Sequence, residues 1–130
     1  MKLKLSCILF FGMIFQLDAQ HLSTDTIFNG TQTENIVSRR LFSDSLCSSF
    51  LVSIKNEIKV HKHVHHSEQV VVISGSAVMS LGDSVFTMKK GDVSFIPANT
   101  WHGARTTSAE PFRVISIQAP QSDGTDRVYK

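Results

Sequence analysis

Short runs of alternating apolar and polar residues cover most of the chain beyond residue 34. Val, Ile, Phe, Ser and Thr dominate these runs, whereas apolar residues at helical spacing are scarce. A period of two is typical of strands, because successive side chains of a strand point to opposite faces. The pattern predicts strands at residues 35–42, 48–54, 58–63, 68–74, 77–81, 85–89, 93–97, 102–107 and 112–118.

The gaps between these strands are short and rich in turn-forming residues, such as Ser74-Gly75, Gly82-Asp83 and Gly91-Asp92. Short connections favour antiparallel neighbours, because parallel pairing needs a long crossover. With 130 residues the chain has room for one domain with a single modest core. The sequence therefore predicts an all-β sandwich or small barrel of antiparallel strands.

The predicted strand 68–74 is apolar on both of its faces, since Val70-Val71-Val72-Ile73 shows no alternation. One face lines the core, and the other face needs a cover. An N-terminal strand or the second subunit of a homodimer would supply it, and the sequence leaves both options open.

The first 19 residues differ in character from the rest of the chain. Lys2 and Lys4 precede an apolar stretch from Leu5 to Phe15, and Leu17-Asp18-Ala19 offers a cleavage site. This arrangement is typical of a secretory signal peptide. The alternative, a retained membrane anchor, is less favoured because the apolar stretch is shorter than the roughly 20 residues of a spanning helix. We therefore expect residues 1–19 to be removed and the protein to be secreted or periplasmic.

The remaining chain divides by composition into three segments. Residues 20–33 are polar and predict a loose lead-in with one short strand at 26–28. Residues 34–120 hold the predicted strands, and residues 121–130 predict a polar surface tail.

Charge and cysteine content exclude several classes of function. Without residues 1–19 the chain has 11 basic and 10 acidic residues, so its net charge is +1. This balance gives no argument for a nucleic-acid partner, or for membrane binding after signal cleavage. Cys7 leaves with the signal and Cys47 is then alone, which excludes a disulfide framework. A lone thiol of this kind is more often a buried filler than a nucleophile.

Histidine is concentrated in one part of the sequence. Of six histidines, five lie in or near one candidate site: His61, His63, His65, His66 and His102. In the predicted strand 58–63, His61 and His63 share a face, because they are two residues apart.

Two further residues complete a candidate ligand set. Glu68 begins the next predicted strand, which we expect to run back beside strand 58–63 as a hairpin. His102 follows a turn in which Pro97 ends a strand and Asn99 tolerates a left-handed backbone. The turn allows His102 to project inward as a fourth ligand from a separate hairpin.

The spacing of these residues resembles the two conserved segments of the cupin superfamily. The first cupin segment has His-x-His, three or four residues, Glu, six residues and Gly, and this chain has His61-Lys62-His63, Glu68 and Gly75 at that spacing. The second has Gly, five residues, Pro-x-Gly, two residues and His, matched by Gly91, Pro97-Ala98-Asn99 and His102.

Three positions depart from the cupin pattern, and none of them is a ligand. Lys55 stands at the leading Gly of the first segment, Asn99 replaces the Gly of the second, and Thr106 replaces its terminal Asn. The resemblance covers about residues 35–118. Within this range the chain resembles compact, single-domain bacterial cupins, and the signal-like residues 1–19 suggest an exported form.

The resemblance implies an antiparallel jelly-roll barrel, also called a double-stranded β-helix, with a metal at its mouth. The implied ligands are His61, His63, Glu68 and His102, a nitrogen-rich set suited to one divalent Zn, Mn, Fe, Ni or Cu ion. Export to an oxidising compartment tilts this choice toward Zn, Mn or Cu.

The other aromatic and imidazole side chains near the site have less specific roles. His65 and His66 lie outside the cupin spacing, and we expect both to be exposed loop residues. A register that used His63, His65 and Glu68 would break that spacing. Trp101 suits either packing under its turn or stacking on a ligand.

Three functions fit a site of this kind. The first is a metalloenzyme acting on a small carbonyl, sugar-like or carboxylate compound, as a lyase, isomerase or dioxygenase. No separate general base of clear identity accompanies it. The second is metal-dependent binding of such a compound without turnover, and the third is a metal-stabilised structural barrel.

Overall fold

A computed structural model describes residues 20–28 and 30–130, so the predicted signal peptide lies outside the described residues. The elements in chain order are η1 (Thr24–Thr26), β1 (Ile36–Ser43), β2 (Ser48–Ile54), β3 (Glu57–His63), β4 (Ser67–Ser74), β5 (Ser76–Leu81), β6 (Ser84–Lys89), β7 (Val93–Ile96), β8 (His102–Thr106), β9 (Phe112–Ala119) and β10 (Arg127–Tyr129). Within the described ranges, no helix is both long and apolar enough to cross a membrane.

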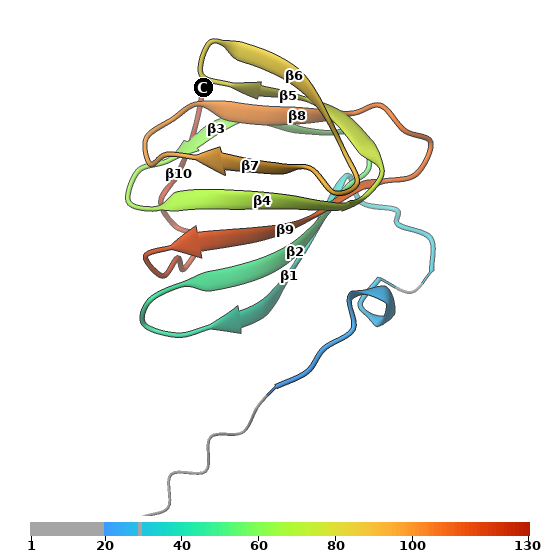
Figure 1. Cartoon of the computed structure of the whole chain (residues 1–130), viewed down its shortest axis with the longest axis horizontal. Coiled ribbons are helices and arrows are strands. Elements are labelled where there is room, and N and C mark those ends of the chain that lie inside the picture. Colours follow the sequence, from blue (N-terminus) through green and yellow to red (C-terminus); the bar gives the residue numbers. More distant parts are fainter. Residues whose placement is uncertain (1–19, 29) are drawn as a thin grey trace, which may run out of the picture.

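The strands form two antiparallel sheets of five strands each (Figure 1). One sheet has the order β1-β2-β9-β4-β7 and the other β10-β3-β8-β5-β6. Neighbours in the sheets are mostly distant in the sequence, as in β9 between β2 and β4. This arrangement confirms the predicted all-β jelly-roll fold.

The nine strands predicted from alternation are β1 to β9, and each observed end lies within one residue of its predicted end. Strand β9 shows why the pattern was informative. Its residues alternate between buried and half-buried positions from Phe112 to Gln118, so every second side chain faces the barrel interior. Because the buried side chains occupy every second position, a shift of one residue would turn them away from the interior, and this fixes the register of the strand.

The lead-in and the tail differ from their predictions. Residues 24–26 form a 3-10 helix in place of a strand at 26–28. The last residues are exposed, as a surface tail would be, but they form a strand: β10 pairs with β3 and extends that sheet. Neither segment carries enough alternation for its structure to be recognised alone, because each is ordered by the strand against which it packs.

The pairing predicted for strand β4 was also wrong. It does not form a hairpin with β3, since β3 pairs with β8 and β10 whereas β4 pairs with β7 and β9. The connection at residues 64–66 therefore crosses from one sheet to the other. This crossing places the end of β3 and the start of β4 on opposite walls of the barrel.

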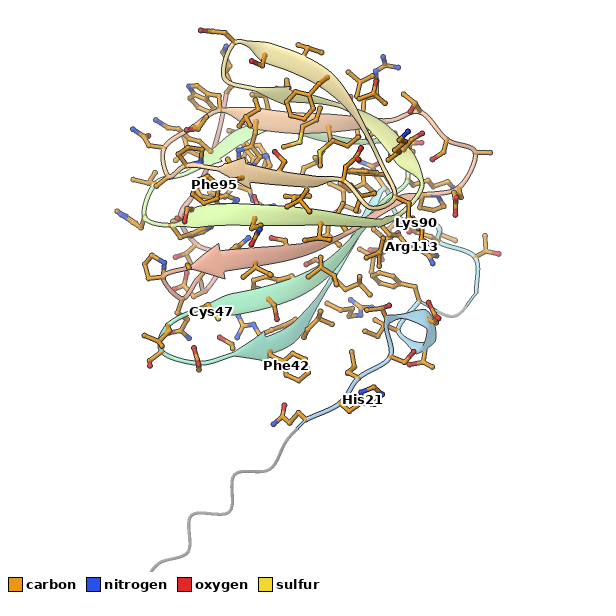
Figure 2. The ribbon with its side chains drawn as sticks, in the orientation of Figure 1. His21, Phe42, Cys47, Lys90, Phe95 and Arg113 are labelled. Atoms are coloured by element: carbon orange, nitrogen blue, oxygen red, sulfur yellow. The ribbon has the colours of Figure 1, made fainter. Side chains whose placement is uncertain are left out.

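The outer face of β4 is partly covered by the N-terminal segment. Val70 and Val72 are buried in the core, whereas Val71 and Ile73 are half-buried on the other face. Thr24 of η1 lines a shallow depression together with Ile73. The Arg113 guanidinium also lies 5.5 Å from the centroid of the Phe28 ring, a contact between this segment and the sheet. Figure 2 shows Arg113 at the end of the sheet beside the N-terminal segment.

The apolar core lies mostly at the end of the barrel away from the histidines, and part of it lines a cavity between the sheets. Its buried members are Ile54, Val70, Val72, Ala77, Met79, Met88, Ile96, Phe112 and Val114. The turn between β4 and β5 needs glycine, because Gly75 has φ +72° and a Cβ there would lie 2.6 Å from the Pro111 carbonyl oxygen.

Candidate metal centre

Strands β3 and β8 place two histidines directly opposite each other. His61 pairs with His102 in the antiparallel register, and their ring centroids are 4.2 Å apart. The strands approach closely beside this pair, since a Cβ on Gly103 would lie 3.0 Å from the Ile58 carbonyl oxygen. A glycine next to His102 therefore allows the two imidazoles to meet.

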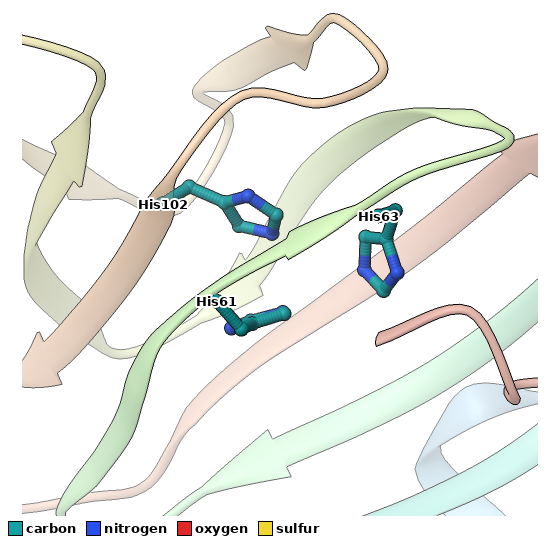
Figure 3. Close-up of side chains that lie close together, drawn as sticks. All are labelled: His61, His63 and His102. Carbon is teal, nitrogen blue, oxygen red and sulfur yellow. The ribbon is translucent and has the colours of Figure 1, made fainter. Parts of the chain in front are cut away.

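His63 joins this pair from the next inward position of β3. Its ring centroid lies 5.1 Å from that of His61 and 5.4 Å from that of His102. Figure 3 shows the three rings converging from the two strands. One ligating nitrogen of each ring lies within 4.8 Å of the other two, and all three side chains are buried. The structure thus brings together the three histidines expected from the spacing.

Glu68 reaches the same point from the opposite sheet. Its Oε2 atom lies 3.2 Å from His102 Nε2 and 3.5 Å from His63 Nε2. Its other oxygen accepts a hydrogen bond from the buried Ser116 hydroxyl, to which the Gln118 amide donates at 3.3 Å. This chain of hydrogen bonds fixes the carboxylate with Oε2 toward the histidines.

The hydrogen bonds of the imidazoles determine which nitrogen faces the centre. Nδ1 of His61 lies 2.8 Å from the Lys59 carbonyl oxygen, and Nδ1 of His102 lies 2.9 Å from the Thr100 carbonyl oxygen. A carbonyl oxygen only accepts, so each Nδ1 carries the proton and each Nε2 keeps its lone pair. Nδ1 of His63 similarly faces a carboxylate oxygen of Asp126 at 3.3 Å.

The unpartnered ring nitrogens fit a metal ion. Nε2 of His63 and Nε2 of His102 are buried and make no hydrogen bond of acceptable geometry among the described residues. A buried polar atom without a partner is costly, and it requires an explanation. Three outward-anchored imidazoles and one carboxylate around a common point form a donor set that a divalent transition metal would satisfy.

A backbone contact links the two halves of the centre. Asn99 has φ +64°, as predicted for its turn, and its N–H donates to the His63 carbonyl oxygen at 2.6 Å. Thr100 closes the same turn by donating to the Pro97 carbonyl oxygen at 3.2 Å. The turn before β8 is therefore bonded to the end of β3, which holds His102 beside His63.

Burial and neighbouring charges tune the protonation of the cluster. Burial, with a further contribution from His102, lowers the pKa of His61 from 6.5 to about 4, so this imidazole is neutral near pH 7. Burial raises the pKa of Glu68, but contacts with His102, His63 and Ser116 outweigh it and hold this pKa well below 4.5. An ionised carboxylate and a neutral imidazole are the forms that bind metal.

His66 and Asp126 also lie at the site, and neither was predicted from the sequence to do so. His66 was predicted to be exposed, but its side chain is buried and its Nδ1 lies 3.0 Å from Asp126 Oδ2. The same carboxylate contacts His63 and accepts from the His65 backbone N–H at 3.1 Å. These contacts outweigh the effect of burial and lower the pKa of Asp126, which keeps it charged.

The pairing of β10 with β3 positions this carboxylate, since Asp126 directly precedes β10 and Arg127 pairs with His63. His63, His66 and Asp126 form a second group of ligand-type side chains that shares His63 with the first. Its short contacts are those of a carboxylate that orients imidazoles. The available signal was Arg127-Val128-Tyr129, a short strand-forming triplet after a carboxylate.

Three other candidate residues have clear positions. His65 is exposed, as expected. Trp101 does not line the cavity, and its ring centroid lies 4.9 Å from Lys62 Nζ on the outer side of β3. Cys47 is half-buried just before β2, and Figure 2 shows it far along the sheet from the labelled Arg113. None of the three contributes a side chain to the histidine cluster.

A cavity of about 260 Å³ lies between the two sheets, and the four predicted ligands line one end of it. Most of the remaining lining is apolar and includes Val52, Met79 and Val114. A cavity of this size accommodates a small molecule directly beside the candidate metal ligands.

Comparison with known protein families identifies a match over more than half of the chain. Residues 50–118 match the model of the family described as Cupin_2, Cupin domain. The chain is also 37% identical over 57 residues to a mannose-1-phosphate guanylyltransferase of Salmonella muenchen. That stretch covers 44% of this chain but 12% of the enzyme, so the chain spans only a small part of this relative's length.

Solved structures share the architecture. An uncharacterized conserved protein with a double-stranded β-helix domain from Klebsiella pneumoniae superposes with a TM-score of 0.72 and 24% identity, covering 86% of this chain and 97% of that one. Oxalate decarboxylase from Bacillus subtilis superposes with a TM-score of 0.57 and 24% identity, covering 65% and 24% of the two chains. At these identities the likeness shows the fold alone.

Proposed function

The chain belongs to the cupin domain family, and from this premise we propose that it holds one divalent transition metal through His61, His63, Glu68 and His102 to bind a small molecule. The observation that carries the proposal is geometric: one nitrogen of each of three buried imidazoles lies within 4.8 Å of the other two, and Glu68 Oε2 faces Nε2 of His102 at 3.2 Å and Nε2 of His63 at 3.5 Å. Anchoring of each Nδ1 pre-orients the rings, so binding costs little rearrangement.

The donor set suits Zn, Mn, Fe, Ni or Cu, and an ion bound there would act as a Lewis acid toward a carbonyl or carboxylate oxygen. The chain's own residues orient and shield the reactants. Ser116 keeps Glu68 turned toward the imidazoles, and the apolar lining excludes water from one side of a ligand. The function that fits these roles best is a small metalloenzyme of the lyase, isomerase or dioxygenase type.

Metal-dependent binding without turnover is the second candidate, and one observation favours it. Among the described residues that line the cavity, Glu68 is the only carboxylate and the only imidazoles are the three proposed ligands. No further general base is therefore within the cavity. Product formation from a small carbonyl, sugar-like or carboxylate compound supports an enzyme, whereas a thermal shift without product supports a binding protein.

Two further proposals, on location and on oligomeric state, rest on other features of the chain. The proposal of a secreted or periplasmic protein rests on the signal-like composition of residues 1–19. The proposal of a homodimer rests on the outer face of β7, where Val93 and Phe95 expose 56% and 61% of their surface. Light scattering at the mass of two chains would support the dimer, and the mass of one chain would contradict it.

Metal uptake tests the central proposal. Protein purified without an affinity tag is incubated with excess Zn²⁺, separated by gel filtration and analysed by mass spectrometry. We expect one zinc ion per chain, and less than half of this for His61→Ala and His102→Ala. His65→Ala is the matched control, because His65 is exposed and its side chain lies outside the cluster. Wild-type protein without zinc, or equal loss in the control, would contradict the site.

A further inference from the structure

The interior of the barrel changes from polar to apolar along its length. Four strands show this change in the same direction. In the sheet with β3 and β8, the cavity lining runs from His63 and His61 to Ile58 in β3 and from His102 to Ala104 in β8. In the other sheet it runs from Glu68 to Val70 in β4 and from Gln118 and Ser116 to Val114 and Phe112 in β9. The cavity therefore has a polar end at the metal centre and an apolar end deeper in the barrel.

The apolar lining of the cavity comes from β2 and β9, neighbours in one sheet, and from Ile58, Met79 and Ala104 of the other sheet. Phe50, Val52 and Ile54 are successive inward residues of β2 and lie opposite Ser116, Val114 and Phe112 of β9. Phe50 and Val52 are half-buried, so part of their surface faces the cavity. Covering this surface with a hydrocarbon group would be favourable.

The polar end carries one cation from the chain itself. Arg127 pairs with His63 across β10 and β3, and directly opposite residues of an antiparallel pair project from the same face. Arg127 lines the cavity, remains exposed at its mouth and makes no ion pair with a carboxylate of the described residues. A divalent ion held by Glu68 would add positive charge beside it, and the ionised Asp126, which contacts His63, would offset part of that charge.

We infer that the cavity binds a small monocarboxylate with an apolar body, its carboxylate between Arg127 and the metal centre and its hydrocarbon part against Val52 and Val114. This inference rests on the proposed metal-dependent function and narrows its ligand to one chemical class. The cavity of about 260 Å³ limits the ligand to a small acid.

The same geometry disfavours sugars. A polyhydroxy compound would place several hydroxyl groups against the apolar wall, where each unpaired hydroxyl carries a desolvation cost. At the other end, Ser116 already donates to Glu68 and one N–H of Gln118 already donates to Ser116, so these two donors are not free for a hydroxyl group. The cavity thus differs in chemistry from a sugar site, although one relative is named for mannose-1-phosphate.

A homologous series of acids tests this inference. Purified protein loaded with one Zn²⁺ per chain is titrated by calorimetry with acetate, butyrate and hexanoate, and with hexanol and mannose as neutral probes. We expect the Kd to fall about fourfold for each methylene that enters the apolar wall, and hexanoate to bind more tightly than hexanol. Mannose should bind more weakly than hexanoate.

Arg127→Gln separates the charge from the apolar wall. The variant should bind hexanoate about tenfold more weakly, with unchanged zinc content and unchanged affinity for hexanol. Arg105→Gln is the matched control, because Arg105 is exposed on β8 and does not line the cavity. This control should bind hexanoate like the wild type.

The outcomes distinguish this inference from the proposed function. A zinc-loaded protein whose Kd is the same from acetate to hexanoate, or that prefers mannose or hexanol to hexanoate, overturns the inference alone. Equal loss of hexanoate affinity in both arginine variants overturns the role of Arg127. A protein that takes up no zinc overturns the proposed function and this inference together.

Discussion

Asp126 offers the sharpest test of how the metal centre is organised, because it contacts a proposed ligand without being one. Its carboxylate lies 3.3 Å from His63 Nδ1, 3.0 Å from His66 Nδ1 and 3.1 Å from the His65 backbone nitrogen. In Asp126→Asn the negative charge is lost, and an amide has a single acceptor oxygen for these three donors. His63 should then be less firmly oriented toward the ion.

The expected loss follows from this geometry. Removal of a group that orients a metal-bound histidine typically lowers metal affinity 10- to 100-fold. The contact with His63 is 3.3 Å, longer than an ideal hydrogen bond, so we expect the low end of this range, about tenfold. Tenfold corresponds to about 1.4 kcal/mol of binding free energy.

The assay is competition for Zn²⁺ between the protein and a chromophoric chelator of known affinity. Asp123→Asn is the matched control, since Asp123 lies in the same segment, is exposed and, within the described part of the chain, accepts hydrogen bonds only from Thr125. Zinc affinity of this control should stay within about twofold of the wild type. Wild-type affinity in Asp126→Asn would refute the orienting role, and an equal loss in both variants would assign the effect to the segment as a whole.

Three further predictions concern Glu68, His61 and Asn99. Ser116→Ala removes the donor to Glu68 and should weaken zinc binding several-fold in the same chelator assay, with unchanged affinity as the contradicting result. The pKa of His61 is about 4 in the folded, metal-free protein against 6.5 for the unfolded group, so the unfolded chain binds the proton first as the pH falls. Stability contributed by this group is therefore complete above pH 6.5 and is lost toward pH 4, by about 3 kcal/mol in urea unfolding experiments. His61→Gln should reduce this pH dependence, and a stability equal at pH 7 and pH 4 would contradict the assignment. Asn99→Val should lower the free energy of unfolding by about 1–2 kcal/mol, because a β-branched residue resists the left-handed φ of +64°, whereas equal loss in Asn99→Gly would show that the backbone conformation is not the cause.

The strands of the barrel could be predicted because their information is local. Strand β9 alternates from Phe112 to Gln118, and short turns such as Ser74-Gly75 mark where strands end. The four candidate ligands could be identified for a similar reason, since each lies at a fixed distance from its neighbours in a motif. His61 and His102 then meet through the pairing of β3 with β8.

The parts that could not be predicted depend on contacts between distant segments. His66 has no alternation or motif that signals burial, and its environment is completed by Asp126, which follows it by 60 residues. The position of Glu68 was also incompletely predicted. Its spacing from His63 fits a hairpin as well as a crossing between sheets, and only the pairing of β4 with β7 and β9 distinguishes the two.

The most direct test of the central claim is X-ray absorption spectroscopy of the zinc-loaded protein at the zinc edge. The account predicts a first shell with three imidazole nitrogens at about 2.0–2.1 Å and an oxygen from Glu68, with the multiple-scattering signal of imidazole. Glu68→Gln should change the oxygen contribution and retain the imidazole signal. A first shell of water oxygens without imidazole, or one containing the sulfur of Cys47, would contradict a centre built from His61, His63, Glu68 and His102.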